Sequence, residues 1–212
     1  MVNTQELIDL SYKEILARKG ASITQEGLVN MFGRPGLVNA RYIVEKYGLN
    51  DKPEEFLEER RKIALDLFDQ KMELMEGVVE LLENTRRWGI KCAIASSGWR
   101  EIVMDTLQKY DITQYFDEVI TAEDLKTSEG KPDPEVFLIT AEKLGVKPEA
   151  CLVLEDAPNG IVAAKAAGMR SIFVPSVEYI ALDQVPADLV LRTLRELNSE
   201  VLNALGKERS RN

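Results

Sequence analysis

The most informative segment of this 212-residue chain is Cys151-Leu152-Val153-Leu154-Glu155-Asp156-Ala157-Pro158-Asn159-Gly160. Its apolar run predicts a buried strand, and the proline and glycine after the two acids predict a turn into a helix. Ligands of open parallel sheets bind beyond the carboxyl ends of the strands, where carboxylates can hold a hard cation such as Mg2+. Taken alone, the same pair is also typical of a helix-capping aspartate beside a solvated glutamate.

Two other loops of the same half carry polar residues at the ends of predicted elements. Ala95-Ser96-Ser97-Gly98 follows an apolar run and offers hydroxyls and main-chain N–H groups to an anion. Gly130-Lys131-Pro132-Asp133-Pro134 places Lys131 on a stiff turn, so less rotamer entropy is lost when its ammonium group holds a phosphate. An ordinary N-cap and a solvated loop lysine are the plainer interpretations of each loop alone. The order and spacing of all three loops indicate an anion site beside a cation site.

The pattern of apolar residues changes near residue 76. Before that point apolar residues recur at helical spacing, and after it short apolar runs alternate with helical segments. This alternation predicts βαβ units and a parallel sheet. We expect a helical domain over residues 1–75, an α/β domain over 76–206 with a final helix over 193–205, and a polar tail over 207–212.

Composition excludes several classes of function. The net charge of −9 opposes binding to nucleic acid or to an anionic membrane surface. The chain has no histidine, which excludes histidine bases and histidine zinc sites, and two cysteines are too few for a four-cysteine zinc site. Cys92 and Cys151 each begin an apolar run, so we expect buried thiols in a reducing compartment. With no signal peptide and no apolar run long enough to span a membrane, we expect a cytoplasmic protein.

Two of these motifs, Gly130–Phe137 and Leu154–Gly160, resemble those of the haloacid dehalogenase superfamily of phosphatases and phosphotransferases. Within it the chain looks closest to the branch of β-phosphoglucomutase and pseudouridine-5′-phosphatase-like enzymes, and the resemblance covers nearly the whole length. It implies a Rossmann-like α/β core with an inserted helical-bundle cap, formed here by the helical domain. The implied activity is Mg2+-dependent hydrolysis of a small phosphomonoester, a sugar or nucleoside phosphate.

The resemblance also implies roles for individual residues. Ser96 matches the phosphate-binding hydroxyl, with the main chain of Ser97 beside it. Lys131 matches the catalytic lysine that neutralises the phosphate and the nucleophile. Glu155 and Asp156 match the acidic pair that holds Mg2+. The partner implied is a small phosphorylated metabolite.

One part of the family pattern is missing from the sequence. The family's nucleophile is the first aspartate of Asp-x-Asp-Gly, at the end of the central first strand. This chain contains no Asp-x-Asp, that is, no two aspartates separated by a single residue. Residues 1–7 resemble the stretch that follows that motif, and Asp9 lies on a helical pattern instead of after a strand. We therefore expect the central strand to be absent, neighbouring strand edges to be unpaired, and this chain to be inactive, because no phosphoaspartate can form.

Three explanations stay open for the missing motif. The sequence starts at an internal methionine of an ordinary enzyme, or the chain is a non-catalytic phosphate- or partner-binding relative, or a partner segment supplies the strand. A mutase-like phosphotransferase is the alternative activity. Some mutase relatives carry an arginine a few residues after a cap glycine, and here Arg34 follows Gly33 directly. Arg34 is therefore either a further phosphate contact or a surface turn residue.

Overall fold

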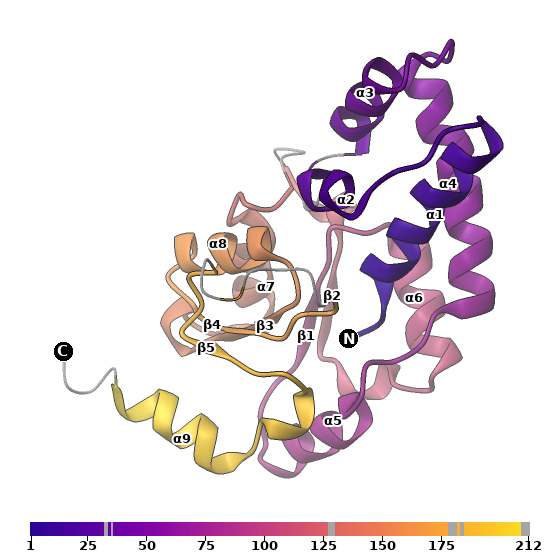
Figure 1. Ribbon diagram of the computed structural model, residues 1–212. Helices are drawn as coiled ribbons and strands as arrows, with labels where there is room; N and C mark the ends of the chain where they lie inside the picture. Colours follow the sequence, from indigo (N-terminus) through magenta and orange to yellow (C-terminus); the bar gives the residue numbers. More distant parts are fainter. Residues whose placement is uncertain (32–33, 35, 127–129, 178–181, 183–184, 209–212) are drawn as a thin grey trace. The chain divides into compact units, whose positions relative to one another are not determined.

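The computed structural model describes residues 1–31, 34, 36–126, 130–177, 182 and 185–208 (Figure 1). These residues form two compact units. The first contains Met1–Met75 and the second Glu76–Pro175, with the C-terminal elements from Leu182 onward also in the second. Each unit has a hydrophobic core of its own.

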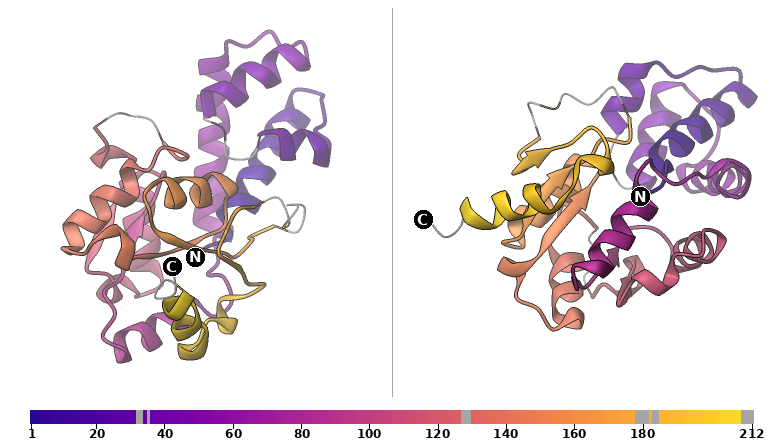
Figure 2. Two further views of the ribbon diagram at one scale, coloured as in Figure 1. Left: turned by 90° about the vertical axis from the view of Figure 1, so that its left-hand side faces the viewer. Right: turned by 90° about the horizontal axis from the view of Figure 1, so that it is seen from below.

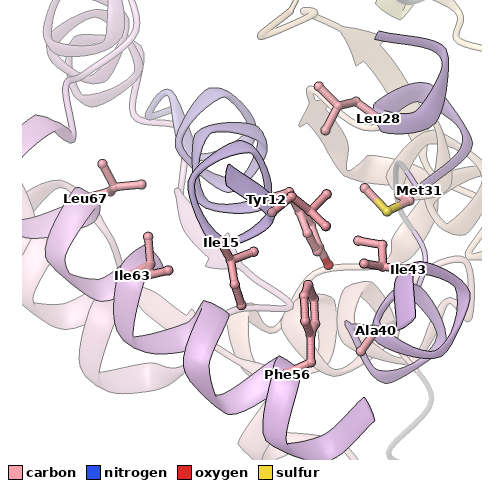
Figure 3. Packing of buried hydrophobic residues seen from close by; sticks show 10 residues of the cluster. Tyr12, Ile15, Leu28, Met31, Ala40, Ile43, Phe56, Ile63 and Leu67 are labelled. Atoms are coloured by element: carbon pink, nitrogen blue, oxygen red, sulfur yellow. The ribbon is translucent and has the colours of Figure 1, made fainter. Parts of the chain in front are cut away.

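The first unit is helical, as its sequence pattern predicts. Its helices are α1 (Thr4–Arg18), α2 (Gln25–Met31), α3 (Gly36–Lys46) and α4 (Pro53–Lys71). Phe56, Ile63 and Leu67 recur at helical spacing along α4, so they share a face that the core buries. Around them pack Tyr12 and Ile15 of α1 together with residues of α2 and α3 (Figure 3).

Tyr12 makes the free energy of unfolding fall as the pH rises through the alkaline range. Its side chain is buried, and burial raises the pKa of its phenol above 10.0, although the Arg60 guanidinium acts in the opposite direction. As the pH rises, the unfolded chain therefore loses the Tyr12 phenol proton before the folded chain does. The contribution of Tyr12 to the unfolding free energy is complete below about pH 10 and is lost as the pH rises through the higher pKa of the folded state. We expect Tyr12→Phe to remove this part of the pH dependence of the unfolding free energy, measured by urea denaturation. Equal alkaline slopes for the two proteins would contradict the assignment.

The second unit alternates helices with strands. In chain order its main elements are α5 (Val78–Arg87), β1 (Ala93–Ala95), α6 (Arg100–Lys109), β2 (Glu118–Ile120), α7 (Glu135–Leu144), β3 (Leu152–Glu155), α8 (Pro158–Ala166), β4 (Arg170–Phe173), β5 (Leu189–Val190) and α9 (Ser199–Glu208). The strands pair in parallel as β1-β2 and as β3-β4-β5. The predicted parallel α/β arrangement is confirmed. Helices α7 and α8 share a core with these strands, built around Val136, Phe137 and Val153.

The main chain of β1 and β3 is paired on one side only within the described part of the chain. The Ser96 N–H donates to the Ile120 carbonyl of β2, so Ala95, one residue earlier, directs its main chain to the other side. The Glu155 carbonyl accepts from the N–H of Val174, just beyond β4. The main chain of Leu154, one residue earlier, therefore points to the side of β3 opposite β4. Parallel strands are normally covered on both faces, yet the Leu154 side chain is 38% exposed. These edges are open where the sequence predicts unpaired strands, while the absence of a central strand stays a prediction.

The C-terminal region differs from the predicted helix over 193–205. Thr193 and Glu196 form a reciprocal capping box around a short 3-10 turn, and the Asn198 side chain then accepts from the N–H groups of Glu200 and Val201. The first pair of side chains caps the short 3-10 turn, and the Asn198 side chain caps the helix that follows, so the chain forms two separate helical segments here. That helix, α9, leads towards the C-terminus (Figure 2) and includes residues 207 and 208, which the sequence assigns to a polar tail. Residues 209–212 of that tail lie outside the described residues.

Two further expectations concern exposure. Cys92 and Cys151 are unbridged thiols, but both are half-buried instead of fully buried, and desolvation raises the pKa of each. The described helices include none that is both long enough and apolar enough to cross a lipid bilayer.

Candidate functional site

Lys131 joins the ends of the two sheets of the second unit. Its Nζ donates to the carbonyl oxygen of Ala95, the last residue of β1, at 3.1 Å, and forms an ion pair with Oε1 of Glu155, the last residue of β3. The same Nζ lies 4.8 Å from the centre of the Phe137 ring. The side chain is only 14% exposed, so these contacts hold the ammonium group largely away from solvent.

Glu155 is the buried member of the acid pair. The residue is 8% exposed, and both of its carboxylate oxygens are engaged. Oε1 pairs with Lys131, while Oε2 accepts from the N–H groups of Asp156 and Ala157 at 3.1 and 3.2 Å. A buried carboxylate is tolerated only with such partners, so Glu155 anchors Lys131 and the start of α8 at once.

Asp156 has a different environment although it is the next residue. The main-chain N–H of Asp156 donates to the Glu155 carboxylate, and the residue lies partly exposed at the carboxyl end of β3. Within the described residues the structure records no hydrogen bond or ion pair of its carboxylate. The sequence treats the two acids as equivalent metal ligands, but among the described residues the Glu155 oxygens are both engaged while those of Asp156 have no recorded partner.

The two serines lie at the end of β1, beside the lysine loop. Ser96 Oγ accepts from the Gly98 N–H at 3.0 Å, which leaves the hydroxyl hydrogen to be donated to an anion. Ser97 is exposed, and a Cβ built on Gly130 would lie 4.0 Å from its Oγ. The structure therefore brings the serine loop, Lys131 and the acid pair together at one end of the strands.

The turn that carries Lys131 is fixed by its own side chains. Asp133 Oδ1 accepts from the Glu135 N–H at 2.8 Å at the start of α7, and the Asp133 N–H donates to the Gly130 carbonyl at 3.2 Å. Sequence reasoning predicts the stiff turn but assigns no role to Phe137. The signal that could have found Phe137 is its place in the sequence, six residues after Lys131 and on the apolar, buried face of α7.

Arg34 belongs to the first unit and is exposed. Its N–H donates to the Met31 carbonyl, and its own carbonyl accepts from the Asn39 side chain. The neighbouring residues 32, 33 and 35 lie outside the described residues, so the sequence comparison that includes Gly33 is not tested. The predicted phosphate contact of Arg34 stays a prediction.

The charges at the strand ends favour a divalent cation. The Lys131 ammonium group balances the Glu155 carboxylate with which it pairs, and the adjacent Asp156 adds a second carboxylate, so the cluster by itself carries excess negative charge and would repel a phosphate. The described residues contain no group of three or more acidic, cysteine or histidine side chains that could enclose a metal ion. Mg2+ is commonly held by one or two carboxylates, retained waters and substrate phosphate oxygens, so this donor set fits it.

Comparisons with known proteins agree with this arrangement. A family model described as haloacid dehalogenase-like hydrolase matches residues 1–174. Hexitol phosphatase B of Escherichia coli (strain K12) is 31% identical over 205 residues, which cover 95% of this chain and 91% of that protein. The probable pseudouridine-5′-phosphatase of Drosophila melanogaster is 30% identical over 204 residues, covering 94% of this chain and 88% of that protein.

A solved structure shows the same fold. The putative β-phosphoglucomutase from Thermotoga maritima superposes with a TM-score of 0.71 at 28% identity, covering 96% of this chain and 93% of that one. Sequence match, fold and the loops at the strand ends lead to one conclusion: the chain belongs to the haloacid dehalogenase-like hydrolase family.

Proposed function

We propose that this chain carries the phosphate-binding and charge-neutralising part of a Mg2+-dependent phosphatase for a small phosphomonoester, a sugar or nucleoside phosphate. The observation that carries the proposal is the half-buried Lys131 ammonium group, held between the Ala95 carbonyl at the end of β1 and the Glu155 carboxylate at the end of β3, next to the serine loop. Hydrolysis is preferred to a mutase reaction because the two curated relatives described above are named phosphatases.

The residues present account for binding and charge. Phosphoryl transfer asks a protein mainly to position the phosphate and to neutralise its charge. Lys131 supplies a cation that is fixed in place before a ligand arrives, so little is lost in ordering it. The Ser96 hydroxyl and the main-chain N–H groups of the same loop orient the phosphate oxygens.

Asp156 and Glu155 are the residues that would hold Mg2+. When bound, the ion would supply the positive charge that the cluster lacks and so favour a phosphate beside Lys131. Asp156 is the more available ligand, since Glu155 is already engaged by Lys131 and two N–H groups.

A further parallel strand completes the site in this proposal. The edges of β1 and β3 that have no partner strand in the described part of the chain would each gain a hydrogen-bonded neighbour, and an aspartate at the carboxyl end of that strand would lie beside Lys131. The strand would come from outside the described residues, as an N-terminal extension or as a partner segment. Without an aspartyl nucleophile we expect the 212 residues to bind phosphate and not to hydrolyse it.

Binding of inorganic phosphate tests the proposed site directly. We expect isothermal titration calorimetry to show phosphate binding that strengthens with Mg2+, and we expect Asp156→Asn to remove that strengthening. Ser96→Ala should weaken phosphate binding by about fivefold, the effect of one hydrogen bond. As a matched control, Ser11→Ala changes a buried serine of the first unit and should leave the affinity unchanged. Phosphate binding that is absent, or unaffected by both site variants, would overturn the proposal.

A further inference from the structure

Gly160 is the third residue of α8 and lies directly against the Glu155 side chain. A Cβ built on Gly160 would stand 2.6 Å from Cγ of Glu155 and closer still to its Cδ and Oε1. Real Cβ atoms do not approach other atoms this closely, so any side chain at this position requires the Glu155 carboxylate to move.

Backbone conformation does not explain a glycine at this position. Gly160 is not among the glycines with positive φ, and it sits within a regular helix. In that setting alanine is the better helix former, so a glycine is unfavourable unless space demands it. The space that this glycine leaves is filled by the Glu155 carboxylate.

We propose that Gly160 is a positioning residue, whose missing side chain lets the Glu155 carboxylate lie between Lys131 and the start of α8. From that place Oε1 reaches the Lys131 ammonium group and Oε2 reaches the N–H groups of Asp156 and Ala157. A side chain at residue 160 would displace a flexible carboxylate instead of the backbone. Its main effect is therefore on these three contacts and on Lys131, and only secondarily on the fold.

The Asp156 and Ala157 N–H groups report the position of Glu155 without any ligand. We expect Gly160→Ala to speed hydrogen exchange at these two amides by about tenfold or more, because each loses a charged acceptor. Exchange at amides in the middle of α7 should not change. Gly36→Ala is the matched control, since a Cβ on this helical glycine would meet only the two movable methyl groups of Leu57, the nearer at 3.1 Å. Unchanged exchange at residues 156 and 157 in the Gly160→Ala protein would overturn the inference.

A double-mutant cycle separates positioning from a general packing effect. In a Glu155→Ala background the obstacle is gone, so adding Gly160→Ala should raise the melting temperature, as helix propensity alone predicts. In the parent protein the same change should not raise it. If Glu155→Ala does not fold, the exchange measurement on Gly160→Ala alone decides the question.

The consequence for phosphate rests on the proposed function. Once Glu155 is displaced, Lys131 loses its anchor, and we expect Gly160→Ala to weaken phosphate binding by about tenfold. A parent protein that binds no phosphate would refute the proposed function, while the exchange rates would still decide the role of Gly160. Phosphate binding that is normal in Gly160→Ala, together with unchanged exchange, would refute only the positioning role.

Discussion

The chain extended at its N-terminus by an apolar strand that ends in Asp-x-Asp-Gly is expected to hydrolyse an aryl phosphate in the presence of Mg2+, whereas the 212 residues alone are expected to show no turnover. The reason is chemical and structural. The sequence has no Asp-x-Asp pair, and among the described residues β1 and β3 are each paired along one edge only, with Lys131 in contact with the last residue of both strands. A strand paired there gains main-chain hydrogen bonds and carries a carboxylate to the lysine. Since enzymes commonly accelerate reactions by about 10⁶-fold or more, the change should be from background to a readily measured rate.

A second extension serves as the matched control. The same strand ending in Asn-x-Asn-Gly should pair equally well and stabilise the second unit, but it should give no activity, because an amide is not a nucleophile of this kind. Amide exchange in β1 and β3 reports whether either extension pairs. Turnover by the unextended chain that Lys131→Ala abolishes would contradict the proposal. An extended chain that pairs but stays inert would favour a non-catalytic phosphate-binding protein.

The second large effect concerns the Lys131–Glu155 pair. We expect Lys131→Met to lower the unfolding free energy by about 3 kcal/mol, because it leaves the buried Glu155 carboxylate without its cation. Phosphate binding should be lost in the same variant. Urea denaturation followed by a probe in the second unit measures the first effect, and titration calorimetry measures the second.

A paired substitution separates stability from binding. Lys131→Met combined with Glu155→Gln removes both charges and keeps a carbonyl oxygen for the Asp156 and Ala157 N–H groups. Most of the lost stability should return, while phosphate binding should not. A single-variant loss below about 1 kcal/mol would show that the pair behaves like a solvated surface ion pair.

The sequence predicts the features that follow from local periodicity. Strands alternating with helices predict the parallel α/β unit, and apolar spacing predicts the helices of the first unit, because these periods are properties of short segments. The order of the serine loop, the lysine turn and the acid pair also placed Ser96, Lys131 and Asp156 at the carboxyl ends of strands. Parallel strands bring such ends to one edge, so their proximity follows from topology.

Other features depend on side-chain geometry that no local pattern contains. The apolar pattern predicts that the final helix begins too early, because whether Thr193 and Asn198 cap separate segments depends on the path of the chain between them. The family resemblance predicts equal roles for the two adjacent acids, while the structure gives Glu155 a buried ion pair and leaves Asp156 partly exposed.

The type of each unit, the family resemblance and the group of residues at the strand ends therefore follow from local sequence patterns. Three further features emerge only in the folded chain: Lys131 links β1 to β3, Phe137 lies against its ammonium group, and Gly160 makes room for Glu155. The physical reason is that the directions of side chains, and the space left between them, are set by backbone segments that meet only when the chain has folded.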